Sequence, residues 1–131
     1  MMYLLDTNTA IYFFKDMGQV AGRLLSHPPD QIAIPTVVIY ELETGIAKST
    51  QPEKRRAQLD KLLRAITILP FGLADAKAAA TLRATLEKAG RPLGPMDNLI
   101  AGTALAHQAT LVTHNTEEFS RAPGLRWEDR Y

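Results

Sequence analysis

The sequence of 131 residues contains no cysteine, so neither disulfide bonds nor thiolate zinc sites can stabilise its fold. It also has no apolar run that approaches the ~20 residues of a transmembrane helix. The apolar start is interrupted at Asp6 and is too short for a secretory signal peptide. Together these absences predict a cytoplasmic protein that depends on its hydrophobic core.

An excess of charge of either sign is lacking as well, because 15 Lys and Arg residues balance 14 Asp and Glu residues. Composition alone therefore does not indicate a nucleic-acid binder, and any such binding must come from local patches. No internal repeat, linker or low-complexity stretch divides the chain. Its length fits a single domain over residues 1–131, which would bury roughly two-thirds of the surface that the unfolded chain exposes.

Short apolar runs alternate with longer stretches of helical periodicity. Strands are expected over residues 2–5, 31–34, 66–69, 110–113 and 125–127, the last of them at a sheet edge. Helices are expected over residues 9–15, 20–25, 74–88 and 96–107, from residues 35 and 52 onward, and as a short turn over 117–119. Parallel neighbours need long crossover connections, which the helices supply. The sequence therefore predicts an α/β fold, a three-layer α/β/α sandwich with a mainly parallel sheet of about five strands.

Three acidic residues stand at positions where a carboxylate is informative. Asp6 ends the first apolar strand, where α/β proteins place ligand-binding residues, although it could equally cap the helix that follows. Glu41 lies within the apolar run 37–42, where an inward-facing carboxylate would need a cation and an outward-facing one would not. Asp97 lies in the first turn of another apolar helix, where it also suits the helix dipole.

A shared metal ion would explain all three acids at once. Carboxylates gathered at one end of a parallel sheet repel one another unless a divalent cation neutralises them. Ligation by oxygen atoms alone, with positions left for water, suits Mg²⁺ or Mn²⁺. A fourth polar group could come from the loop after the strand at 110–113, which reads Thr113-His114-Asn115-Thr116-Glu117-Glu118-Phe119.

At four places the sequence resembles the PIN-domain ribonucleases and, among them, the VapC toxins of VapBC toxin-antitoxin systems. The motifs are Leu4-Leu5-Asp6-Thr7-Asn8-Thr9, Tyr40-Glu41-Leu42-Glu43-Thr44-Gly45, Gly94-Pro95-Met96-Asp97-Asn98-Leu99-Ile100-Ala101-Gly102 and Leu111-Val112-Thr113-His114-Asn115-Thr116-Glu117-Glu118-Phe119. They follow the family's order and run nearly from end to end. The resemblance implies a PIN fold and a Mg²⁺- or Mn²⁺-dependent endoribonuclease in which Asp6, Glu41 and Asp97 form the acidic, metal-binding cluster.

One position departs from the family's pattern. Many PIN proteins have a further aspartate two residues after the threonine that ends the fourth strand, and here that residue is Asn115. An amide can orient a water molecule or bind a metal through its oxygen, but it adds no negative charge. Toxins of this type with an asparagine in the loop carry a glutamate before the phenylalanine, which makes Glu118 the candidate replacement. The alternative is that Glu118 is an exposed residue of a polar loop.

The resemblance also implies a substrate and partners. Similar toxins cut initiator tRNA in the anticodon loop, so a structured tRNA is the expected substrate and inhibition of translation the expected effect. Members of the family form homodimers, and a VapB antitoxin wraps its C-terminal segment over the active site. The adjacent rings of Tyr12, Phe13 and Phe14 favour a covering partner, because one helix cannot bury all three against one sheet. Alternatively, they fill gaps between neighbouring helices.

Other polar residues are assigned supporting roles. Thr7, Asn8 and Thr113 are expected to orient the acids, with Thr7 or Asn8 capping the first helix. Basic residues near the motifs are candidates for RNA phosphate contacts, with solubility as their alternative role: Lys15, Lys48, Arg91 and Arg121. The histidines are expected to be non-catalytic, because His107 lies nearly three turns from Asp97 and no acidic partner is recognisable for the other two, His27 and His114.

Other classes of protein also place an aspartate after the first strand. A haloacid-dehalogenase-like phosphatase would need a second aspartate where Asn8 stands, and a receiver domain would need a lysine near Thr113. Neither requirement is met. A non-catalytic PIN-like module that acts with a DNA-binding partner would share the fold and the three acids, and it is the alternative to the ribonuclease.

Overall fold

A computed structural model describes residues 1–16 and 18–131, and within them five strands form one sheet. The strands are β1 (Tyr3–Leu5), β2 (Ile32–Pro35), β3 (Thr67–Leu69), β4 (Thr110–Val112) and β5 (Arg126–Glu128). Their order is β3-β2-β1-β4-β5, and every neighbouring pair is parallel. The predicted α/β class, the parallel sheet and the edge position of the last strand are confirmed.

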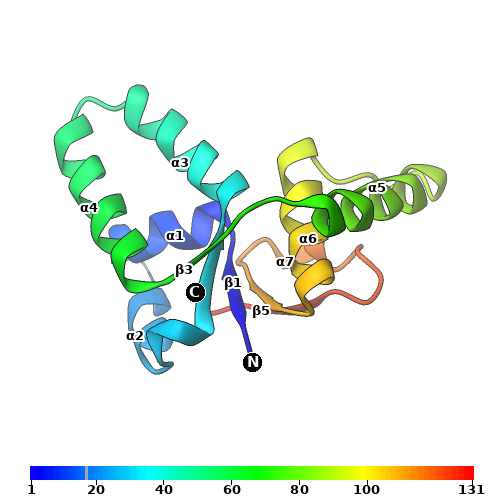
Figure 1. The fold of residues 1–131 in the computed structure, drawn as a ribbon, viewed down its shortest axis with the longest axis horizontal. Coiled ribbons are helices and arrows are strands. Elements are labelled where there is room, and N and C mark those ends of the chain that lie inside the picture. Colours follow the sequence, from blue (N-terminus) through cyan, green and yellow to red (C-terminus); the bar gives the residue numbers. More distant parts are fainter. Residues whose placement is uncertain (17) are drawn as a thin grey trace.

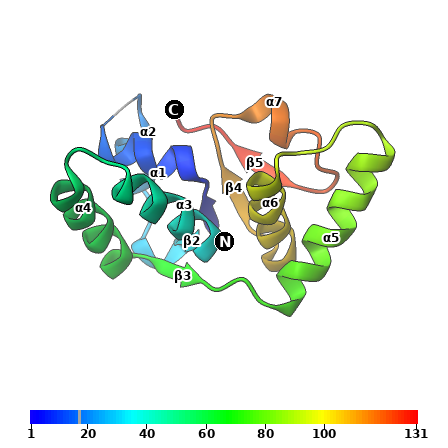
Figure 2. The same ribbon diagram turned by 90° about the horizontal axis from the view of Figure 1, so that it is seen from above.

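The helices occur where apolar periodicity predicts them. They are α1 (Thr7–Phe14), α2 (Val20–Leu25), α3 (Thr36–Ala47), α4 (Pro52–Ala65), α5 (Leu73–Lys88), α6 (Pro95–His107) and α7 (Thr116–Phe119), with a short 3₁₀ turn η1 (Pro29–Gln31). Both views place α3 and α4 on one side of β1, and α5 and α6 on the other (Figure 1, Figure 2). No helix in these described stretches is long and apolar enough to cross a membrane.

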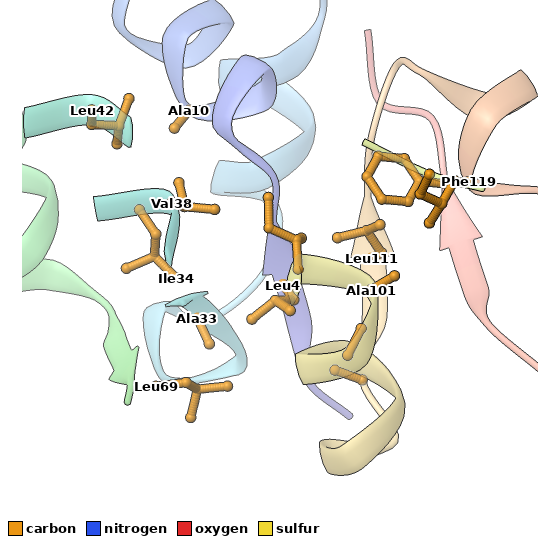
Figure 3. Close-up of a cluster of buried hydrophobic side chains, with 14 of the residues drawn as sticks. Leu4, Ala10, Ala33, Ile34, Val38, Leu42, Leu69, Ala101, Leu111 and Phe119 are labelled. Atoms are coloured by element: carbon orange, nitrogen blue, oxygen red, sulfur yellow. The ribbon is translucent and has the colours of Figure 1, made fainter. Parts of the chain in front are cut away.

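Alternate residues of the strands enter two separate hydrophobic clusters. Leu4 and Leu111 belong to the larger cluster, which α3 and α6 complete (Figure 3). Tyr3 and Leu5 belong to the smaller cluster, which includes Val20 of α2. Because successive side chains of a strand point to opposite faces, the two clusters bury both faces of the sheet.

The rings at 12–14 are half-buried by their own chain. Phe13 and Phe14 pack against the larger cluster, and Tyr12 packs against the smaller one. All three rings nevertheless remain partly exposed, so the expectation that another chain covers some of this surface stays a prediction.

Helices α5 and α6 pack closely, and two polar contacts join them. Asn98 Nδ2 of α6 donates to the Ala79 carbonyl oxygen of α5 at 2.9 Å. At the other end of the pair, His107 Nε2 lies 3.1 Å from the buried Asp75 carboxylate. Gly102 lies where the helices are closest, since a Cβ atom there would be 2.5 Å from the Ala79 Cβ. Position 102 therefore has no room for a side chain.

We expect Gly102→Ala to lower the free energy of unfolding by about 1–3 kcal/mol, because the added methyl group would force α5 and α6 apart. Gly45→Ala is the matched control, because an added Cβ at this exposed position of α3 meets nothing within 4 Å. It should raise the free energy of unfolding by up to ~1 kcal/mol through helix propensity alone. Urea denaturation of both variants measures the difference, and equal stabilities would contradict the close contact of α5 with α6.

Candidate active site

The acidic residues gather where the strand order reverses. From the central strand β1, the chain adds β2 and β3 on one side and β4 and β5 on the other. Connections therefore diverge between β1 and β4, and a crevice forms at the carboxyl ends of these two strands. Asp6 follows β1 directly and Thr113 follows β4 directly. Parallel pairing of β1 with β4 brings the two residues side by side.

Asp6 is almost fully buried, and both of its carboxylate oxygens accept hydrogen bonds. Oδ1 accepts from the backbone N–H of Thr9 at 2.8 Å, and Oδ2 accepts from the Thr113 hydroxyl at 2.6 Å. Burial raises the pKa of Asp6, the bonds from Thr113 and Thr9 act against that rise, and the nearby Glu41 adds to it. The predicted role of Thr113 in orienting Asp6 agrees with this geometry.

The helix cap differs from the sequence-based expectation. Asp6 itself caps α1 through its bond to Thr9, so the expectation that Thr7 or Asn8 would do so was wrong. Thr7 instead donates its hydroxyl hydrogen to Glu41 Oε1 at 2.6 Å. The Asn8 side chain is exposed and makes no hydrogen bond with the described residues. The first turn of α1 thus orients two acids: the Thr9 N–H binds Asp6, and the Thr7 hydroxyl binds Glu41.

Glu41 lies on the edge of the buried face of α3. Its neighbours Val38 and Leu42 point into the core, Tyr40 points to solvent, and Glu41 between these directions is half-buried. Glu41 also lines a groove between α1, α3 and α4, together with Lys15. The Glu41 carboxylate is also close enough to Asp6 and Asp97 to raise the pKa of both, so it belongs to the same crevice.

Asp97 brings the third carboxylate from the start of α6. Gly94 precedes the helix and Pro95 occupies its first position, which leaves Asp97 in the first turn. Burial raises the pKa of Asp97 to about 6, and repulsion from Glu118, Asp6 and Glu41 contributes in that order. Protonated Asp97 donates a hydrogen bond to Glu118, which raises the pKa further. Four carboxylates therefore act on one another across the crevice.

Glu118 lies beside Asp97, and Asn115 holds it there. Asn115 Nδ2 donates to Glu118 Oε2 at 2.7 Å, and the Gly94 backbone N–H donates to Oε1 at 3.2 Å. These bonds, led by that from Asn115, lower the pKa of Glu118 even though burial opposes the change. The Asn115 backbone N–H donates to the Thr113 hydroxyl oxygen at 3.0 Å. The segment from Thr113 to Glu118 thus orients two acids: Thr113 binds Asp6, and Asn115 binds Glu118.

The acids do not form a closed metal cage. Within residues 1–16 and 18–131, no three His, Cys, Asp or Glu side chains are close enough together to hold one ion. Mg²⁺ does not require such a cage, because it keeps several water ligands and often takes only one or two carboxylates together with substrate phosphate oxygens. An all-oxygen donor set whose members repel one another fits an ion of this kind.

The basic residues singled out in the sequence are mostly exposed. Lys15 lines the same groove as Glu41, Lys48 follows α3, and Arg91 lies in the loop before α6. Arg121 is partly buried, and its Nη1 donates to the Pro92 carbonyl oxygen at 3.3 Å. Its charge also lowers the pKa of Glu118, so Arg121 acts on the acidic site as well as on the loop.

Sequence reasoning missed two contributors to the site. Arg55 of α4 lines the same groove as Glu41, although α4 reads as a solvated charged helix. The Gly94 backbone N–H binds Glu118, and only the preceding turn residues could have indicated a free donor at that position. His114 also has an acidic partner, Asp129, whose separation of 15 residues hides the pair from any local pattern.

Comparison with known proteins gives the family. The chain matches the PIN domain over residues 3–125. It is 35% identical to a tRNA(fMet)-specific endonuclease VapC from Shigella flexneri over 127 residues, covering 97% of this chain and 96% of the relative. It is 37% identical to Ribonuclease VapC2 from Rickettsia felis over 131 residues, covering 98% of each.

Solved structures agree with this match. VapBC2 from Rickettsia felis, bound to a DNA fragment from its promoter, has a TM-score of 0.92 at 36% identity and covers 98% of both chains. DNA-bound VapBC from Salmonella typhimurium has a TM-score of 0.94 at 32% identity, covering 100% of this chain and 99% of the other. The chain therefore belongs to the PIN-domain family and, within it, to the VapC ribonuclease toxins of VapBC systems.

Proposed function

We propose that this protein is a Mg²⁺- or Mn²⁺-dependent endoribonuclease that hydrolyses phosphodiester bonds of tRNA, with the anticodon loop of initiator tRNA as its target. The observation that carries the proposal is the group of carboxylates around Asp97, whose mutual repulsion a bound cation would relieve. A relative named as a tRNA(fMet)-specific endonuclease supports the choice of substrate. Cleavage of this tRNA in the cytoplasm would stop translation.

In this proposal Asp6, Glu41 and Asp97 hold the cation, and Glu118 completes the acidic site with Asn115 as its support. When bound, the ion supplies a more acidic water molecule and neutralises charge on the phosphate. The residues of this chain do the positioning. Thr113 and the Thr9 backbone hold the Asp6 carboxylate, Thr7 holds Glu41, and Asn115 keeps Glu118 beside Asp97.

No side chain is required as a nucleophile. A carboxylate of the crevice is suited to accept a proton from an attacking water molecule. RNA phosphates would be drawn to this acidic crevice only through surrounding cations. Lys15, Lys48 and Arg91 are exposed, and we assign them this role.

We propose a VapB-type antitoxin and a second copy of this chain as partners. Solved relatives are VapBC complexes, which supports the antitoxin. The homodimer is supported by three exposed apolar residues, Tyr40, Ile68 and Leu73, with 62%, 42% and 72% of their surface accessible. They lie on neighbouring segments, because the Phe71 N–H donates to the Thr36 hydroxyl one turn before Tyr40. Exposed apolar residues grouped in this way are typical of an interface.

Cleavage of purified tRNA by antitoxin-free protein tests the activity. We expect cutting with Mg²⁺ or Mn²⁺, none with EDTA, and a loss of at least about a hundredfold in Asp6→Ala and Asp97→Ala, because each removes a ligand. Asp30→Asn is the control, since Asp30 is exposed before β2 at the opposite edge of the sheet. Absence of cutting by the wild type would favour the non-catalytic, DNA-associated alternative, and full activity of Asp97→Ala would exclude the proposed site.

The raised pKa of Asp97 predicts a pH-dependent cost in stability. The carboxyl group of Asp97 has a pKa of about 6 in the folded protein and 3.8 in the unfolded chain. The free energy of unfolding therefore falls as the pH rises from 3.8 to about 6, and it stays lower above pH 6. In EDTA, Asp97→Asn should therefore match the wild type near pH 3.5 and exceed its free energy of unfolding by about 1 kcal/mol at pH 7, after allowance for solvent screening. Urea denaturation at both pH values measures this difference in the free energy of unfolding. Added Mn²⁺ should make the difference at pH 7 smaller, because the ion would bind the wild-type carboxylate.

The oligomeric state tests the second-copy interface. Leu73→Glu places a charge at the most exposed of the three apolar residues and should convert a dimer into a monomer without altering the fold. Sedimentation equilibrium gives the mass and circular dichroism checks the fold. Lys88→Glu, a charge change at an exposed residue at the far end of α5, is the control. A wild-type protein that is monomeric at high concentration would contradict the dimer.

A further inference from the structure

The residues after β5 pack against the loop that carries Asn115 and Glu118. His114 Nδ1 donates to the Asp129 carboxylate, at 3.0 Å from Oδ2. The Tyr131 ring stacks on the His114 ring, with centroids 4.2 Å apart and planes 19° apart. The ring of Tyr12 from α1 meets Tyr131 edge-on at 4.9 Å. His114 is therefore held by a carboxylate and a ring that both lie more than a dozen residues farther along the chain.

These contacts belong to a segment that is itself well anchored. The Tyr131 carbonyl oxygen accepts from the Gln19 N–H at 2.7 Å, and the Tyr131 N–H donates to Asp129 Oδ1 at 2.9 Å. Gly18, with a φ of 61°, lies under Tyr131, since a Cβ there would be 2.7 Å from the Tyr131 carbonyl oxygen. Position 18 thus needs glycine for both its backbone conformation and its close approach.

Arg130 fixes the same segment from its other side. Its guanidinium group donates to the Arg23 carbonyl oxygen at 3.1 Å and to the Glu128 carboxylate at 3.0 Å. The same group lies 4.6 Å from the centre of the Tyr3 ring, over its face. Residues 129–131 are therefore attached to β1, to α2 and to the turn between α1 and α2.

His114 stands between the two residues that orient the acids. Thr113 before it binds Asp6 Oδ2, and Asn115 after it binds Glu118 Oε2. Fixing the His114 ring limits movement of the backbone from 113 to 115, because the two rigid peptide units on either side of His114 connect it directly to Thr113 and Asn115. Small displacements of catalytic groups lower rates strongly, so a contact that limits them affects the reaction without touching the substrate.

We propose that residues 129–131 act as a clasp on His114, and that His114, Asp129 and Tyr131 are positioning residues for the acidic site. The kinetic part of this proposal rests on the proposed ribonuclease activity. The clasp works through the shape of the 113–118 loop and requires no contact with RNA or metal.

Steady-state cleavage of tRNA tests the clasp. Tyr131→Ala removes the stacked ring and should lower kcat about tenfold with KM unchanged, the lower end of effects seen for residues that orient ligands. Tyr131→Phe keeps the ring and should restore the wild-type kcat. Trp127→Ala, which removes an exposed ring from β5 itself, should also behave as the wild type. A wild-type kcat in Tyr131→Ala, a change confined to KM, or an equal loss in Trp127→Ala would overturn the proposal.

A double-mutant cycle tests whether Tyr131 acts through His114. If it does, Tyr131→Ala should have no further effect in a His114→Ala background, so the double variant should lose about as much kcat as the worse single variant. Independent losses that multiply would mean that the two residues act separately, which would contradict the clasp.

Amide hydrogen exchange separates failure of the clasp from failure of the ribonuclease proposal. In metal-free protein, Tyr131→Ala should exchange the Asn115 and Gly94 amides several times faster than the wild type, because both amides bind groups of the held loop. The Leu111 amide in β4 serves as the control. Unchanged exchange at Asn115 and Gly94 would overturn the clasp even if the protein cuts RNA, and faster exchange would support it even if no RNA is cut.

Discussion

The two hydrogen bonds of the Asp6 carboxylate are the interaction on which the arrangement of the site depends. One bond begins α1 and the other joins the end of β1 to the residue that follows β4. Without them, burial would drive this carboxyl group further toward its neutral form. A single side chain therefore caps a helix, links the ends of two neighbouring strands and places a negative charge in the crevice.

Negative charge is concentrated in this crevice, and the repulsion between the carboxylates lowers the stability of the folded protein. Asp97 carries the clearest sign of it, because its pKa of about 6 results from burial and from three other carboxylates. Structural sites seldom keep like charges so close, whereas sites that bind cations or transfer protons depend on them. The electrostatic strain and the proposed chemistry thus have the same origin.

Much of the fold could be predicted from local patterns. Alternating apolar runs and helical periodicity indicated a parallel α/β sheet, and Pro52 marked where α4 begins. Asp6, Glu41 and Asp97 could be grouped because parallel strands bring their carboxyl ends to one edge. Hydrogen-bond partners could not be predicted in the same way. Whether Asp6 or Thr7 caps α1 depends on side-chain directions, and the contact of His114 with Asp129 depends on the pairing of β4 with β5.

The contact of α5 with α6 links a region remote from the chemistry to the site. Asn98 follows Asp97 directly, and its amide binds the Ala79 carbonyl oxygen on α5, while Gly102 one turn later meets the same residue. A larger side chain at position 79 would push α6 away and carry Asp97 with it. The small residues at positions 79 and 102 therefore help to keep Asp97 in place, although α5 itself carries none of the acidic residues of the candidate site.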